Sequence, residues 1–65
     1  MKTIETIKKE NAYIALYDLI EDKLEAIRKA NGWRKWTDER YDKAMKDVAK
    51  ELEVDADELK EYFED

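Results

Sequence analysis

The chain has 65 residues, with 13 basic and 18 acidic side chains, so its formal net charge is −5 and 48% of its residues are charged. It contains no Pro, Cys, His, Ser or Gln, which excludes disulfides, cysteine–histidine zinc sites and a serine nucleophile. The length predicts a single domain over residues 1–65, and no apolar run approaches the ~20 residues of a membrane span. Because the absence of Cys fits a reducing compartment, we expect a cytoplasmic protein without membrane contact.

The charge is divided unevenly along the chain. Residues 1–36 carry eight basic and six acidic side chains, a net charge of +2, whereas residues 37–65 carry five basic and twelve acidic side chains, a net charge of −7. The C-terminal half is therefore expected to repel phosphate and attract cations or basic partners.

The N-terminal segment carries an apolar stripe formed by Ile4, Ile7 and Ile14, with Asn11 between the last two. In a continuous helix this stripe lies nearly opposite the apolar face of the residues that follow. Such a helix from residue 3 would be about 42 Å long, whereas a compact domain of this size is roughly 28 Å across.

Two interpretations of the stripe remain open. Either the helix breaks near Asn11 or leaves an exposed stripe, or Ile4, Ile7, Asn11 and Ile14 form a self-association surface. An Asn between two Ile at heptad-like spacing resembles the way short helical dimers set their register, and this predicts a homodimer.

The first long helix is predicted over residues 11–30, with a start at residue 3 as the alternative. Apolar residues recur at spacings of three and four and form one broad face. Gly32 suits the left-handed position just past the helix end, and Trp33 follows it.

The second helix is predicted over residues 38–52. Thr37 is a suitable N-cap, and Trp36 and Tyr41 have the spacing of a hydrophobic staple across the helix start.

The third helix is predicted over residues 56–63, with Asp55 as N-cap and Glu58 completing a capping box. Val54 and Leu59 have the spacing of a second staple. No segment alternates like a strand, so the expected fold is all-α, a three-helix domain. The predicted core consists of Leu16, Ile20, Leu24, Ile27, Trp36, Tyr41, Met45, Val48, Leu52, Leu59 and Tyr62 or Phe63.

Residues 45–65 resemble the two-helix core of helix-turn-helix DNA-binding domains. Ala49 stands where that family has the small residue at which the two helices cross, and apolar residues match the family pattern at Val48, Leu52, Val54, Leu59 and Tyr62. The resemblance implies that the last two helices cross in a helix-turn-helix-like arrangement, and it implies DNA binding as an activity.

The same segment departs from that family at two points. Glu53 stands where the turn usually has Gly, so the turn needs a non-Gly residue in a strained conformation. The start of the last helix, which should enter the major groove, carries Asp55, Asp57 and Glu58, and carboxylates there face phosphates. We therefore do not expect DNA contact through this helix.

The only basic stretch covers the end of the first long helix and the residues that follow it, and it contains Arg28, Trp33, Arg34, Lys35 and Trp36. Basic residues interleaved with aromatic ones can stack on bases or bind acidic peptides. Alternatively, both Trp side chains cover the core and the cations favour the C-terminus of the first long helix.

The many carboxylates fit helix caps and solvated helix faces better than a site. Lys60 stands where a calcium loop that begins at Asp55 would need Gly, and a domain this small has little room for a catalytic pocket. We expect no enzyme activity, no catalytic residue, no metal and no cofactor.

The sequence favours a non-enzymatic, acidic helical protein that acts through protein–protein interaction as a small regulator. The partner is expected to be another protein. One alternative is a nucleic-acid-binding or transcription-regulating helix-turn-helix domain. Another is a designed helical bundle without biological function, because capped helices, a single Gly and no Pro are design habits.

Overall fold

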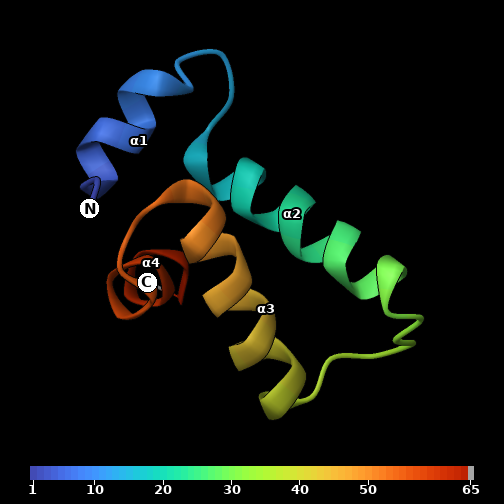
Figure 1. The fold of residues 1–65 in the computed structure, drawn as a ribbon. Coiled ribbons are helices and arrows are strands. Elements are labelled where there is room, and N and C mark those ends of the chain that lie inside the picture. Colours follow the sequence, from blue (N-terminus) through green and yellow to red (C-terminus); the bar gives the residue numbers. More distant parts are fainter. Residues whose placement is uncertain (65) are drawn as a thin grey trace.

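The computed structural model describes residues 1–64 and confirms the all-α class (Figure 1). It contains four helices rather than the three predicted, and no strand occurs within these residues. The helices are α1 (Ile4–Glu10), α2 (Leu16–Ala30), α3 (Asp38–Leu52) and α4 (Ala56–Glu64).

The additional helix is α1, which results from a break at Asn11. Thr3 caps its start, since its Oγ1 accepts a hydrogen bond from the backbone N–H of Thr6 at 3.2 Å. Asn11 ends it, and both its backbone N–H, at 3.1 Å, and its side-chain Nδ2, at 3.0 Å, donate to the carbonyl of Ile7. A loop then leads to α2, which begins at Leu16 and not at residue 11. The helix is therefore not continuous from residue 3.

The starts of α3 and α4 follow the local signals of the sequence. The side chain of Thr37 accepts a hydrogen bond from the N–H of Arg40 at 3.2 Å, and α3 has the predicted bounds. The carboxylate of Asp55 accepts one from the N–H of Glu58 at 3.2 Å. Each bond satisfies a backbone donor that the first turn of a helix leaves free.

The core is formed by side chains from all four helices and the α3–α4 turn. Six predicted core residues are buried, and five more, Ile27, Tyr41, Leu52, Tyr62 and Phe63, are partly buried against them. The complete set of buried apolar residues is Ile7, Leu16, Ile20, Leu24, Ala44, Met45, Val48, Ala49, Val54 and Leu59. Trp36 was predicted in the core, but 36% of it is exposed.

The turn between α3 and α4 has the strained residue that its sequence predicts. Glu53 has φ 61° and ψ 38°, the left-handed conformation that Gly adopts most easily. The N–H of Val54 donates to the carbonyl of Ala49 at 3.0 Å, which closes the end of α3. The N–H of Lys2 donates to the carbonyl of Glu53 at 2.7 Å, so the start of the chain lies against this turn.

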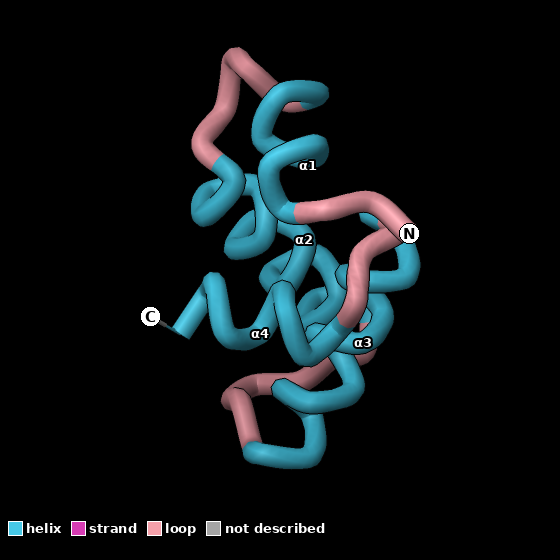
Figure 2. The backbone as a smooth tube through the Cα atoms, turned by 90° about the vertical axis from the view of Figure 1, so that its left-hand side faces the viewer, coloured by secondary structure: helices cyan, strands magenta, loops and turns pink. Residues whose placement is uncertain are grey.

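The molecule measures 33 × 22 × 20 Å, and α3 packs against both α2 and α4. The α1–α2 loop and the α2–α3 loop lie at opposite ends of it (Figure 2). No helix within residues 1–64 has both the length and the apolar character that crossing a membrane requires.

Candidate interaction surface

The predicted basic, Trp-containing segment lies just after the end of α2. Gly32 has φ 68°, which confirms the predicted left-handed position. Its N–H donates to the carbonyl of Lys29 and that of Trp33 donates to the carbonyl of Arg28, each at 3.1 Å. This pair of bonds is the Schellman ending of a helix, and it turns the chain back so that Trp33 lies beside the last turn of α2.

Arg28 holds this loop in place. Its Nη1 donates a hydrogen bond to the carbonyl of Trp33 at 2.7 Å, while its Nε donates to Glu25 at 3.1 Å and its Nη2 contacts the same carboxylate oxygen. The hydrogen bond with Glu25 raises the pKa of Arg28 and lowers the pKa of Glu25. Arg28 was predicted as a partner-binding residue, and in the structure its donors are engaged within the molecule.

Three aromatic rings form a row at this end of the molecule. The rings of Trp33 and Trp36 meet edge to face with their centroids 6.0 Å apart, and those of Trp36 and Tyr41 do so at 6.4 Å. Edge-to-face contact is a preferred geometry for aromatic pairs. Trp36 therefore packs on other aromatic rings at the rim of the fold and not in the core.

Two cations from the first turns of α3 approach the ring of Trp33. The Cζ atom of Arg40 lies 5.5 Å and the Nζ atom of Lys43 lies 6.0 Å from its centroid. Arg40 also donates to the carbonyl of Lys35 at 3.1 Å. Arg40 and Lys43 were not among the predicted site residues, although their spacing of three residues, just after the second Trp, places two cations on one face of a helix.

We define the cationic aromatic surface as Trp33, Arg34, Lys35, Trp36, Arg40 and Lys43. Within residues 1–64, its four cations take part in none of the ion pairs that the structure shows. The acidic side chains nearest to them in the sequence are Asp38, Glu39 and Asp42. Asp38 and Glu39 lie in the first turn of α3, where they favour the positive helix end, and Asp42 forms an ion pair with Lys60. The surface thus groups four positive charges that lie outside the ion pairs of residues 1–64, in a chain whose net charge is −5.

The four residues of the predicted self-association stripe are separated in the structure. Ile7 is buried, at 2% exposure, and Ile4 packs against the core. Asn11 caps α1, and only Ile14, at 38%, is exposed. Because the chain turns at Asn11, the apolar face of α1 covers the core and does not extend the face of Ile14.

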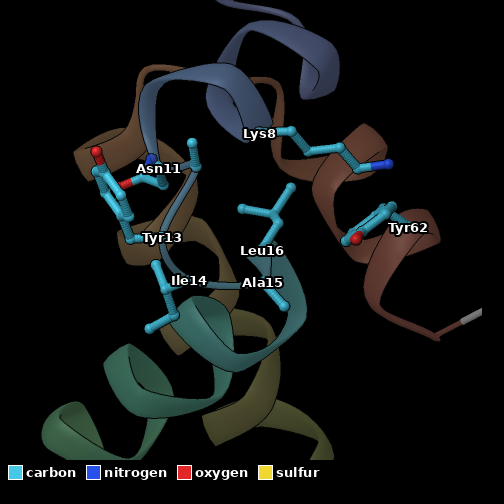
Figure 3. Close-up of a pocket in the computed structure, with 8 residues that line it drawn as sticks. Lys8, Asn11, Tyr13, Ile14, Ala15, Leu16 and Tyr62 are labelled. Carbon is cyan, nitrogen blue, oxygen red and sulfur yellow. The ribbon is translucent and has the colours of Figure 1, made fainter.

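A second surface feature was missed by the sequence analysis. An open groove of about 340 Å³ lies between the α1–α2 loop and α4, and Figure 3 shows Tyr13 and Ile14 on one side of it and Tyr62 on the other. It is lined by Lys8, Asn11, Ala12, Tyr13, Ile14, Ala15, Leu16 and Tyr62. Residues 11–17 are the longest stretch of the chain without a charged residue, and that stretch is the signal from which the groove could have been found.

No protein-family model, curated protein or solved structure is similar enough to this chain to count as a match. In the part of the chain that the structure describes, no group of three or more acidic side chains could hold a metal ion. The candidate site therefore has to be judged on its own geometry.

Proposed function

We propose that the protein is a non-enzymatic interaction module that binds an acidic segment of a partner protein through the cationic aromatic surface. The observation that carries this proposal is the grouping, around two partly exposed indoles, of four cations that lie outside the ion pairs of the described residues 1–64. Trp and Arg are the residue types most enriched among the residues that dominate binding energy at protein interfaces. Carboxylates of a partner would pair with the cations while an apolar side chain packs on Trp36.

An acidic peptide fits this surface better than a nucleic acid does. The four cations of this surface lie at one end of the molecule, whereas residues 37–65, which include Arg40 and Lys43, have a net charge of −7 overall. A nucleic acid is longer than the few nucleotides that this surface could cover. Its remaining phosphates would be repelled by the acidic side chains of residues 37–65. A short acidic segment contacts the cations alone.

We further infer that α3 and α4 form a helix-turn-helix-like crossed pair that serves as a scaffold for this surface. Ala49 is buried between apolar neighbours, and Glu53 takes the left-handed conformation at the turn. α4 has Asp57 and Glu58 in its first turn, so the scaffold does not present a basic helix to DNA. The crossed pair positions Arg40 and Lys43 beside the α2–α3 loop, because both lie on α3.

Tryptophan fluorescence tests the proposed function directly, since the chain has two Trp and both lie in the surface. The probe is a synthetic peptide of alternating Glu and Phe, about twelve residues long, titrated at low and at high salt. We expect a saturable change in emission that weakens with salt, and no change with the corresponding peptide of alternating Lys and Phe. Arg34→Glu should weaken binding about tenfold, because it replaces an attraction by a repulsion.

Lys9→Glu is the matched control, because it reverses one exposed charge on α1, at the other end of the molecule (Figure 1). It should leave peptide binding unchanged. A thymidine oligonucleotide of about 20 nucleotides serves as the competing probe. Tighter binding of the oligonucleotide than of the peptide, or no binding of either, would overturn the proposal.

A further inference from the structure

The α1–α2 loop and the start of α2 present an apolar surface to solvent. Residues 11–17 carry no charge in a chain that is 48% charged. Tyr13 is fully exposed, and Tyr17 and Ile14 are 48% and 38% exposed. We call Tyr13, Ile14 and Tyr17 the Tyr13 patch. The largest exposed apolar patch on a monomeric protein is often a binding site.

The patch has a shape that can complement itself. Tyr13 projects from the loop beside the groove of about 340 Å³, whose floor is Leu16 and whose far side is Tyr62 (Figure 3). The ammonium group of Lys8 lies 5.0 Å from the ring centroid of Tyr62, and the rings of Tyr17 and Phe63 stack with their centroids 4.7 Å apart. A projecting ring and a hollow of about the right size thus occur on one surface.

The uncharged stretch is flanked by two acidic residues, Glu10 and Asp18, and Glu10 forms an ion pair with Lys2 at 2.8 Å. Lys9 is in the last turn of α1 and Asp18 in the first turn of α2. Neither takes part in an ion pair among residues 1–64. A two-fold axis that crosses the line from Lys9 to Asp18 places Lys9 of one copy opposite Asp18 of the other, so the charges complement each other across such a contact.

We infer that the protein self-associates through the Tyr13 patch as a symmetric dimer, with the Tyr13 ring of each copy in the groove of the other. A two-fold contact uses the same patch on both copies, so the patch must complement itself. The Tyr13 patch meets this condition because it carries both the projecting ring and the groove. The three exposed side chains offer roughly 350 Å² per copy, well below the ~800 Å² per partner of a stable complex. The dimer is therefore weak, with a dissociation constant on the order of 0.1 to 1 mM.

Sedimentation equilibrium over a wide concentration range tests this dimer. The average mass should rise from 7.8 kDa toward twice that value as the concentration increases. Tyr13→Lys should keep the mass at that of the monomer, because it places a charge in the groove, and its fold should persist because Tyr13 packs on nothing. Arg34→Glu changes the cationic aromatic surface at the opposite end of the molecule and should dimerise like the unchanged protein.

A charge exchange tests the arrangement of the two copies. Lys9→Glu and Asp18→Lys should each weaken dimerisation severalfold, since each places like charges opposite one another, and the double variant should restore it. A protein that stays monomeric into the millimolar range, a Tyr13→Lys variant that dimerises normally, or a double variant weaker than both single ones would overturn the inference. The proposed function would survive these results, because the peptide titration uses a different surface and dilute protein.

Discussion

The guanidinium group of Arg28 donates a hydrogen bond to the backbone carbonyl of Trp33 at 2.7 Å and thereby fixes the loop that follows α2. The same group is held by Glu25, one turn earlier on the helix. Arg28 is therefore a positioning residue for the cationic aromatic surface, and it leaves partner contact to the exposed cations around it.

Replacing Arg28 by Lys should loosen this loop. Lys keeps the positive charge but lacks the planar fork that reaches Glu25 and the Trp33 carbonyl together. We expect the free energy of unfolding and the melting temperature to fall, because the hydrogen bond to the Trp33 carbonyl is lost. Circular dichroism during heating measures the effect. Arg34→Lys, in an exposed residue without a hydrogen bond, should change nothing, and an equal loss in both variants would contradict the role of Arg28.

Replacing Glu53 by Gly should stabilise the protein. In the left-handed conformation, a residue other than Gly destabilises the folded state by roughly 1–2 kcal/mol. Gly avoids this cost, but its greater flexibility in the unfolded chain offsets part of the gain in stability. The net gain should be about 0.5–1 kcal/mol in the free energy of unfolding, measured by urea titration. Glu53→Gln separates the loss of the ion pair with Lys2, at 3.2 Å, from the change in the backbone, and it should give no gain.

Replacing Ile7 by Ala should detach α1 from the rest of the protein. Ile7 is buried, and truncating a buried Ile to Ala costs about 2–5 kcal/mol. Hydrogen exchange should show the Asn11 N–H, which donates to the Ile7 carbonyl, losing protection before the amides of α2 and α3. Ile14→Ala, at an exposed position on the same predicted stripe, should have little effect. Equal effects of the two variants would mean that α1 does not cover the core.

The ion pair between Lys60 and Asp42 links α4 to α3 at 2.8 Å, and it should make stability depend on pH. The hydrogen bond from Lys60 lowers the pKa of Asp42 below its ordinary value of 3.8. The contribution of the ion pair to the free energy of unfolding is therefore complete above pH 3.8, the ordinary pKa of Asp. It is lost as the pH falls through the lowered pKa of Asp42 in the folded protein. Asp42→Asn should be less stable than the unchanged protein at about pH 6, and this difference in stability should vanish at about pH 2. Asp47→Asn, at an exposed residue outside the ion pairs, should show no such convergence.

The elements that the sequence predicts well are those with strong local signals. The start of α3 follows from Thr37, and the end of α2 follows from Gly32, because a cap and a left-handed turn involve only residues within a few positions of each other. The break at Asn11 carries no comparable local signal. It depends on whether the burial of Ile7 against the core stabilises the fold more than a continuous helix past Asn11 would. That balance depends on residues far from Asn11 in the sequence.

The part of the cationic aromatic surface that the sequence predicts is the part that is local in the chain. The basic segment with Trp33 and Trp36 is contiguous, so the sequence shows it. Arg40 and Lys43 join it only because α3 runs back past the loop and brings them over Trp33. The contact between Trp36 and Tyr41 follows from their staple spacing, but the exposure of Trp36 depends on which elements lie above it.

By itself, the sequence determined the helical class, the caps, the separation of charge between its two halves and the absence of the usual nucleophiles and metal ligands. All of these depend on composition or on short-range spacing. Tertiary structure alone decided that α1 folds back and that Ile7 is buried while Tyr13 is exposed. It also decided that Arg28 binds Glu25 and the Trp33 carbonyl, while the four cations of the cationic aromatic surface lie outside the ion pairs of residues 1–64. The physical reason is that burial and charge pairing depend on contacts between residues far apart in the chain, and only the packed fold sets those contacts.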